Sequence, residues 1–285
     1  MTSEPTPAAD AGADDPVATK RRLVSLLGQA WASMDGLLSQ LGDEQWEADA
    51  LPGWNVHDVV AHVVGTERQL SGAEPPPALP PEVTGSHVHN DIARMNEAWI
   101  VALHDLPHEE LHRQFTDITA TRLAQLEAMP PDAYLAPSWT PVGPGTYGRF
   151  MEVRVFDVWM HEQDIRAASG LPGHESGPVA AQSLAEVTKS LGYIVGKRAA
   201  MPDGTTVRIR LTGPLATDLH VAVDGRARVV DELLGEPSVS LSLPASLFLR
   251  LAGGRLDGEL VLDQVELGGD RDLARQLATH LAFTL

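Results

Sequence analysis

The sequence predicts an all-helical domain at residues 17–200 followed by a small α+β domain at residues 201–285. Three observations support this fold class. In the first region, apolar residues recur three and four positions apart, which is the period of amphipathic helices. After residues 201–204 (Met-Pro-Asp-Gly), the pattern changes to the alternation that is typical of half-buried strands. A chain of 285 residues is also long enough for two domains of ordinary size.

Capping and turn residues delimit the helices of the first region. Residues 1–16 are small, acidic and contain proline, so we expect them to form a disordered tail. Helical periodicity then runs from about residue 17 to residue 41. After a turn at residues 51–54, Asn55 is placed to cap a helix that ends near Leu70. The other elements predicted here are a proline-rich loop at 71–86, helices at 88–104 and 108–128, a Pro/Gly-rich connection at 130–148, and helices at 149–168 and 178–200.

The second region combines short strands with short helices. Residues 206–212 (TVRIRLT) alternate apolar and polar side chains, as a half-buried strand does. Asp224-Gly225 is a typical hairpin turn between two further strands. After residue 212 we expect strands at 219–223, 227–230, 239–243 and 259–262, and helices at 244–251 and 270–282.

The charge balance and the lack of cysteine exclude several classes of function. The chain has 39 acidic and 21 basic side chains, and its net charge is −18. This charge disfavours binding to nucleic acid, which requires a basic surface, and docking to anionic lipid. Without cysteine, the chain has no disulfide, no thiolate nucleophile, no iron–sulfur cluster and no cysteine-based zinc finger. Any metal site must therefore use histidine and carboxylate ligands.

The sequence gives no indication of a targeting or membrane segment. Residues 1–19 have no basic side chain and no apolar core, so they do not resemble a signal peptide. No later stretch reaches the ~18 uncharged apolar residues that a transmembrane helix requires. We therefore expect a cytoplasmic protein whose partners are small molecules.

One face of the predicted helix at 149–168 combines apolar with ionisable residues. On a helical wheel, Asp157 and His161 lie four residues apart in the middle of a mostly apolar face. Burying a carboxylate and an imidazole is costly unless the two groups are paired or bind a metal. Asp164, one turn further along, is placed to accept a hydrogen bond from the His161 ring and to orient it.

The predicted helix at 55–70 offers a complementary set of side chains. Its apolar face consists of valines, with His62 on the flank and Glu67 near the centre. If the two helices pack in a bundle, His62 meets Asp157 and His161. Two histidines and one carboxylate on facing helices would form a divalent-metal site with open positions for water or substrate. Glu67, like Asp164, is then a candidate for supporting the ligands from behind.

Each of these residues also has a simpler interpretation. His62 alone is compatible with a buried histidine that has found a hydrogen-bond partner. Asp157 and His161 are compatible with a plain hydrogen-bonded pair. Glu67 is able to reach solvent or to pair with a nearby arginine, either Arg68 or Arg154. The other histidines of this region are expected to be solvated, namely His57, His87, His89, His104, His108 and His112.

Two segments around these residues resemble the signatures of a known family. Residues 51–67 (LPGWNVHDVVAHVVGTE) and 155–166 (VFDVWMHEQDIR) are similar, in order and in spacing, to motifs of the maleylpyruvate isomerase family of mycothiol-dependent enzymes. That family belongs to a larger DinB-like group of metal-binding four-helix bundles. The resemblance covers residues 20–200. The remainder is similar to the family's α+β C-terminal domain, which is related to sterol-carrier-like folds.

The resemblance implies a DinB-like four-helix bundle followed by a small α+β domain, and it implies site residues. His62, Asp157 and His161 would hold a divalent metal, usually zinc, and mycothiol would be the thiol cofactor. The isomerase pattern has glutamate where this chain has Asp157, so the metal would sit closer to that helix or differ in identity. The isomerase also uses an arginine of its C-terminal domain, for which the candidates here are Arg208, Arg210, Arg226 and Arg228.

The function implied is metal-dependent activation of mycothiol for isomerisation of, or transfer to, a small electrophile such as maleylpyruvate. A metal with open positions can hold a thiol as thiolate or polarise a carbonyl group. Two alternatives stay open: a metal-dependent hydrolase that uses a metal-bound hydroxide, and a non-enzymatic protein that binds a metal and an apolar ligand. Turnover without added thiol would favour the hydrolase. A metal saturated by protein ligands would favour the binding protein.

Overall fold

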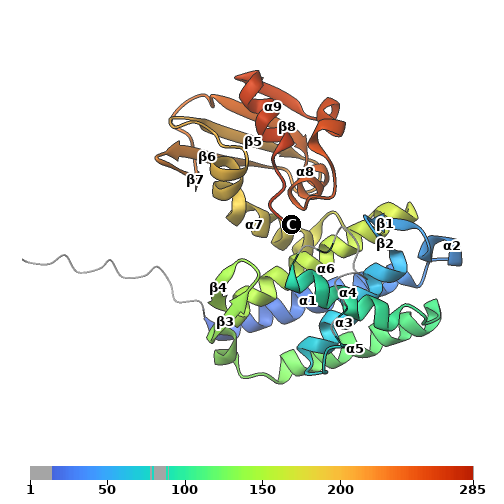
Figure 1. Ribbon diagram of the computed structural model, residues 1–285. Helices are drawn as coiled ribbons and strands as arrows, with labels where there is room; N and C mark the ends of the chain where they lie inside the picture. The colour runs from blue at the N-terminus through green and yellow to red at the C-terminus, as the bar shows by residue number, and fades with distance from the viewer. Residues whose placement is uncertain (1–14, 78, 80–87, 89, 285) are drawn as a thin grey trace, which may run out of the picture.

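The computed structural model of the protein describes residues 15–77, 79, 88 and 90–284. Figure 1 shows a helical domain below a sheet-containing domain, with the C-terminus between them. In the helical domain, α1 (Pro16–Leu38), α3 (Val56–Leu70), α5 (His108–Ala128) and α6 (Tyr147–Ser169) pack together as a four-helix bundle. A further helix, α4 (Asp91–Leu103), packs against α3. The predicted fold class, a helical domain followed by an α+β domain, is confirmed.

Helix α1 begins earlier than the sequence pattern suggests. The Asp15 side chain accepts a hydrogen bond from the backbone N–H of Val17 at 3.0 Å and so caps the helix. Pro16 takes the first helical position, where its missing N–H has no intrahelical partner to lose. Residues 15 and 16 therefore belong to the cap and the helix rather than to the expected tail. Residues 1–14, and half of the predicted loop at 71–86, lie outside the described residues.

Helix α3 begins and ends where the sequence predicts. The Asn55 side chain accepts a hydrogen bond from the backbone N–H of Asp58 at 2.9 Å, and the Asp58 carboxylate accepts one from the backbone N–H of Asn55 at 3.1 Å. This reciprocal capping box satisfies two donors that would otherwise lack partners. The helix packs against α4, α5 and α6, so it is buried well beyond its valine face.

Helix α6 is the central element of the helical domain. It contacts α1, α3 and α7 (Gly177–Tyr193), and most of its residues from Arg154 to Ile165 are buried. Thr146 caps its first turn, and Gly170 ends it in the left-handed conformation with φ 71°. Because the helix is covered on several sides, its polar residues must pair inside the protein. None of the helices in the described ranges is long and apolar enough to span a lipid bilayer.

Two small hairpins and a short helix lie where only turns and connections were predicted. β1 (Asp49–Leu51) pairs with β2 (Trp54–Asn55) across the expected turn, just after α2 (Asp43–Trp46). The Pro/Gly-rich connection contains a 3₁₀ helix at Pro131–Leu135 and a second hairpin, formed by β3 (Pro137–Thr140) and β4 (Gly143–Thr146). These strands are too short and too rich in proline and glycine to show a clear alternation.

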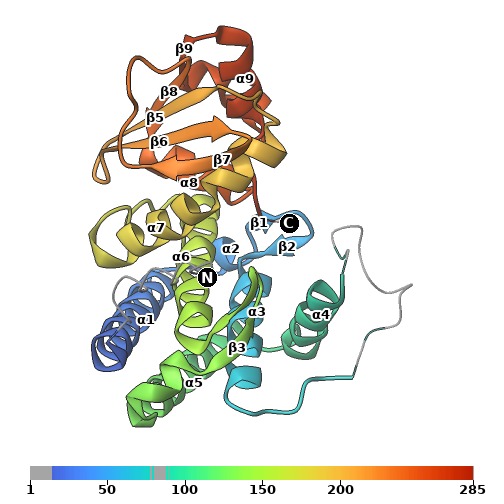
Figure 2. The ribbon, with the colours of Figure 1, turned by 90° about the vertical axis from the view of Figure 1, so that its left-hand side faces the viewer.

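The C-terminal domain is a five-stranded sheet of order β7-β6-β5-β8-β9. β5 (Thr206–Thr212), β6 (Thr217–Asp224) and β7 (Arg226–Val230) form an antiparallel meander, and β5 pairs in parallel with β8 (Val239–Pro244). Helix α8 (Ala245–Ala252) follows β8, and α9 (Arg271–Thr279) packs against β8 and β9 (Glu266–Gly269). Figure 2 shows α7 between the sheet and the bundle. The first four strands and both helices were predicted.

The strand predicted at 259–262 is wrong. Gly258–Gln264 forms a 3₁₀ helix, because Asp257 caps the backbone N–H of Glu259 at 2.9 Å and turns the chain. The fifth strand is instead β9, which pairs with β8. Its Gly269 has a φ of 70°, and an added Cβ atom there would lie 2.2 Å from the backbone oxygen of Ser238, next to β8. Glycine is therefore required by the pairing, although glycines in a sequence suggest a turn.

A second difference in the predicted elements follows α7. The helix expected at 178–200 ends as an α-helix at Tyr193 and continues as a π-helical turn at Ile194–Arg198. At this end of the helix, Gly192 and Gly196 lie against the backbone and side chain of Ala227 in β7. The close packing of helix on strand leaves no room for a side chain at either glycine. The periodicity of the sequence does not distinguish a π-helical turn from a further α-helical one.

Candidate metal centre

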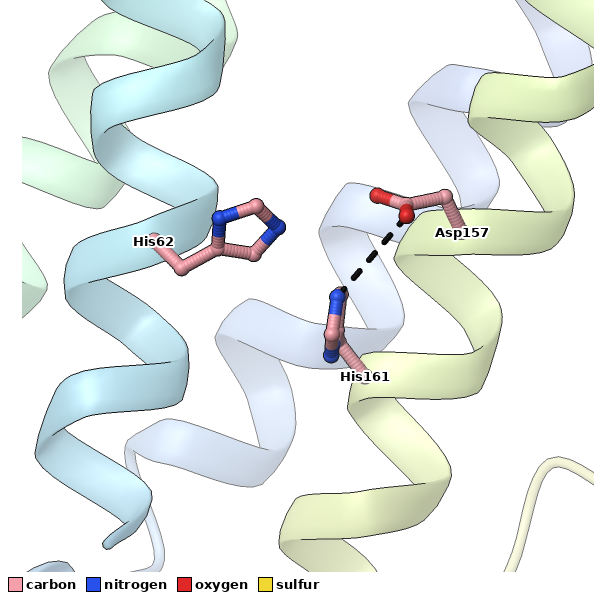
Figure 3. Close-up of side chains that lie close together, drawn as sticks. All are labelled: His62, Asp157 and His161. Carbon is pink, nitrogen blue, oxygen red and sulfur yellow. Dashed lines mark ion pairs between the residues drawn. The ribbon is translucent and has the colours of Figure 1, made fainter. Parts of the chain in front are cut away.

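His62, Asp157 and His161 lie together between α3 and α6, as the sequence predicts. One ligand atom from each of the three residues lies within 4.8 Å of the other two. Asp157 and His161 are one turn apart on α6, and the ring of His62 points at them from α3 (Figure 3). No other group of three or more histidine or acidic residues in the described ranges is close enough to hold a metal ion.

The environment of His62 keeps its ring neutral. The residue is only 5% exposed. Burial lowers the pKa of His62 to about 3, and the nearby charges of His161 and Arg154 act in the same direction. Among the residues that the structure describes, its buried Nδ1 atom has no hydrogen-bond partner, so the simpler interpretation of a satisfied core histidine does not hold. A neutral imidazole beside a carboxylate is the form in which histidine binds metal ions.

Asp157 is the charged member of the group. Burial alone would raise its pKa, but the positive charges around it, with that of Arg154 the largest, together outweigh burial and lower the pKa to about 2. Its side chain is partly exposed to solvent: 34% of its surface is accessible, against 7% for the side chain of His161. An ionised carboxylate and two histidines are a donor set suited to zinc or a similar divalent ion. The partly exposed Asp157 therefore brings one edge of the cluster into contact with solvent.

Asp164 contacts His161 as the spacing suggests. The Nδ1 atom of His161 lies 3.2 Å from a carboxylate oxygen of Asp164, which is buried. A carboxylate accepts hydrogen bonds, so Nδ1 donates to Asp164, and Nε2 is the ring atom left to bind a metal. Nε2 is the atom that lies 3.8 Å from Asp157, on the side of the ring that faces the site (Figure 3). Asp164 therefore fixes both the orientation and the tautomer of His161.

Glu67 does not touch any of the three clustered residues. Its carboxylate is buried and accepts hydrogen bonds from Arg154 at 2.5 Å and from Arg122 at 3.2 Å. Arg154 in turn donates a hydrogen bond to Asp157. Of the two pairings considered from the sequence, the one with Arg154 is the one that forms. Glu67 is linked to the cluster through Arg154 alone.

Arg255 of the C-terminal domain contacts Asp164, the partner of His161, and is not among the four arginines proposed from the sequence. Its Nε atom donates to both oxygens of Asp164, at 3.0 and 3.1 Å. The four arginines proposed from the sequence lie on β5 and β7, and one of them, Arg210, pairs with Asp218. Arg255 follows two glycines after α8. Gly253 lies so close to α6 that an added Cβ atom would be 2.7 Å from the Met160 methyl group.

The two glycines before Arg255 are the only feature of the sequence that points to this residue. Glycine allows the backbone to approach a helix closely, and here it brings Arg255 next to α6.

Of the histidines that were expected to be solvated, His57 was predicted wrongly. His57 is buried, with its Nε2 atom 3.0 Å from the backbone oxygen of Leu106. Its ring packs among those of Trp46, His104 and His108. The nitrogen atoms of these three histidines do not come close enough together to hold one metal ion. His87 and His89 lie outside the described residues.

Comparisons with known proteins agree with this architecture. Residues 27–166 match the family model of the mycothiol maleylpyruvate isomerase N-terminal domain, and residues 181–276 match that of the corresponding C-terminal domain. A crystal structure of a mycothiol-dependent maleylpyruvate isomerase is similar, with a TM-score of 0.55 and 20% identity over 88% of this chain and 92% of that chain. A histidine-to-alanine mutant of a mycothiol-dependent maleylpyruvate isomerase is similar with a TM-score of 0.54, 19% identity and the same coverage. No curated protein matches the sequence significantly.

Proposed function

This chain belongs to the mycothiol maleylpyruvate isomerase family, and we propose that it activates mycothiol with a divalent metal held by His62, Asp157 and His161. The reaction we propose is isomerisation of, or thiol transfer to, a small electrophile such as maleylpyruvate. The observation that carries the proposal is the cluster itself: two histidines and one ionised carboxylate converge from two helices. The expectation of an enzyme is confirmed at the level of the family.

The donor set supports zinc as the metal. Three protein ligands with nitrogen and oxygen donors are typical of catalytic zinc sites, which keep one position open. Bound at such a site, a divalent metal lowers the pKa of a thiol that joins it, so that the thiol is deprotonated at neutral pH. The chain has no cysteine of its own, so the thiol must come from a small molecule.

The residues around the cluster favour an anionic reactant. The positive charges of Arg154 and Arg255 act on both His62 and Asp157 and contribute to lowering the pKa values of these two residues, and we propose that the same charges attract an anionic reactant. We assign to Arg255 the role of the C-terminal-domain arginine that the family resemblance implies. In an isomerisation, the thiol sulfur bonds to one carbon of the double bond, the remaining single bond rotates, and the C–S bond breaks. The thiol is returned, so the reaction needs no further reactant.

A metal assay on the purified protein tests the proposal. We expect about one equivalent of zinc or a similar metal per chain, lost in His161→Ala and retained in His112→Ala. His112 is the matched control because it pairs with Asp35 on the surface, away from the cluster. Thermal stabilisation should require both metal and mycothiol. A protein that contains no metal, and whose stability chelation leaves unchanged, contradicts the proposal. Turnover without added thiol would favour the hydrolase instead.

A further inference from the structure

A buried row of charged side chains lies behind Asp157. The Nε atom of Arg122, on α5, donates to one carboxylate oxygen of Glu67, on α3. Arg154, on α6, donates from Nη2 to the other oxygen of Glu67 and from Nη1 to Oδ2 of Asp157. The side chains of Arg122, Glu67 and Arg154 are each less than a tenth exposed. The proposed chemistry does not by itself require this row.

Stability alone does not account for these charges. Removing ions from water costs several kcal/mol per ion, and apolar residues of similar volume often stabilise a protein as well or better. Buried ionic groups are therefore weak evidence for a stabilising role. The row does have a clear geometric consequence, because it ends on one particular oxygen atom of Asp157.

The two hydrogen bonds of Arg154 set the direction of the Asp157 carboxylate. Arg154 lies three residues before Asp157 on the same helix, and the planar guanidinium is held from the other side by Glu67. With Oδ2 of Asp157 bonded to Arg154, the other oxygen, Oδ1, lies 3.8 Å from Nε2 of His161. Without this constraint the short carboxylate would be free to rotate about its side-chain bonds.

We propose that Arg154, held in place by Glu67, is the positioning residue for Asp157: it binds the carboxylate oxygen Oδ2 and leaves the other oxygen, Oδ1, facing His161. The inference rests on the proposed metal-dependent function. The arrangement mirrors the one on the opposite side of the cluster, where Arg255 holds Asp164 and Asp164 orients His161. Each α6 residue of the cluster is thereby fixed by an ionic partner behind it.

Zinc affinity of the metal-free protein tests the proposal. We expect Arg154→Lys and Glu67→Gln each to weaken zinc binding about 10- to 100-fold, measured by competition with a chromophoric chelator. Lysine keeps the positive charge at position 154 but lacks the fork that binds two carboxylates at once. Glu67→Gln changes the same contact without altering α6. Because both variants act through one contact, their effects on the zinc dissociation constant should not add in the double variant.

Arg122→Lys is the matched control. It disturbs the same buried glutamate, but from the side that does not lead to Asp157. We expect this variant to lower the melting temperature as Arg154→Lys does, while its zinc affinity stays like that of the wild type. The visible spectrum of bound Co²⁺ gives a second readout, which a change in stability alone does not move. It should change in Arg154→Lys and Glu67→Gln and not in Arg122→Lys.

The outcomes separate this inference from the proposed function. If the wild type binds zinc and the two variants bind it equally well, Arg154 is structural and the inference is wrong. If the variants bind zinc more tightly, the contact between Arg154 and Glu67 hinders metal binding, which also overturns the inference. A wild type that binds no metal contradicts the proposed function and the inference together. If Arg154→Lys does not fold, the affinity and the Co²⁺ spectrum of Glu67→Gln decide.

Discussion

Tyr134 is a buried polar residue whose titration is measurable. Its hydroxyl group donates a hydrogen bond to the backbone oxygen of Leu126 at 3.0 Å, and burial raises its pKa to about 12. An unfolded tyrosine has a pKa of about 10. Between these two values the unfolded chain loses the proton first, so the free energy of unfolding should fall as the pH rises.

We therefore expect the wild type to lose more stability between pH 9 and pH 11 than Tyr134→Phe, which has no proton to lose at this position. Urea denaturation at the two pH values measures the difference. Tyr134→Phe should be less stable than the wild type at pH 9, because the backbone oxygen of Leu126 loses its partner. Equal pH dependence in the two proteins would mean that Tyr134 ionises normally in the folded state.

At the scale of elements, the candidate site depends on close packing of α3 against its neighbours. Gly65 is in the middle of α3, and an added Cβ atom there would clash with the side chain of Trp99 in α4. Glycine has a lower helix propensity than alanine by about 1 kcal/mol, so this position would favour alanine if packing were not the limit. The contact between the two helices therefore explains a residue that the helix alone does not.

We predict that Gly65→Ala destabilises the protein by about 1–3 kcal/mol, because the overpacked contact outweighs the gain in helix propensity. Gly36→Ala in α1 is the control. Gly36 is exposed, with nothing within 4 Å of an added Cβ atom, and this substitution should stabilise the protein by about 0.5–1 kcal/mol. Denaturant midpoints measure both changes. If both substitutions stabilise the protein, α4 is able to move away from α3 without loss of stability, and the prediction for Gly65 is wrong.

At the scale of the whole molecule, the two domains meet at the candidate site through Arg255. This residue also donates to the backbone oxygen of Gly253 at 2.8 Å, which fixes the turn that carries it. The end of the chain reinforces the turn: Thr284 donates to the same oxygen at 2.7 Å, and the ring of Phe283 packs against that of Phe156 in α6. Figure 1 shows the C-terminus at this junction. The C-terminal domain thereby holds Asp164, the carboxylate that contacts His161.

We predict that Arg255→Met destabilises the protein by up to about 3–5 kcal/mol, because it leaves the buried carboxylate of Asp164 without its cationic partner. Arg210→Met is the control. Arg210 pairs with Asp218 on the exposed surface of the same domain, and its loss should leave the melting temperature almost unchanged. Thermal unfolding of both variants compares the two ion pairs. Similar, small shifts for both would mean that the domains do not depend on Arg255 for their association.

The sequence by itself determined the features that depend on local spacing. The 3.6-residue period predicted the bundle helices, and the capping residue Asn55 located the start of α3. Because residues four apart in a helix share a face, the same spacing placed Asp157 beside His161. The 3₁₀ helix at Gly258–Gln264 was missed because its short apolar run is equally compatible with a strand.

Only the tertiary structure decided which arginines hold the carboxylates of Asp157 and Asp164. Arg154 and Glu67 are 87 residues apart in the sequence, and Arg255 and Asp164 are 91 apart. No local pattern relates positions so distant, since their contact depends on how helices and domains pack. The sequence therefore identified the residues proposed to bind the metal. Only the folded protein showed that Arg154 holds Asp157 and that Arg255 holds Asp164.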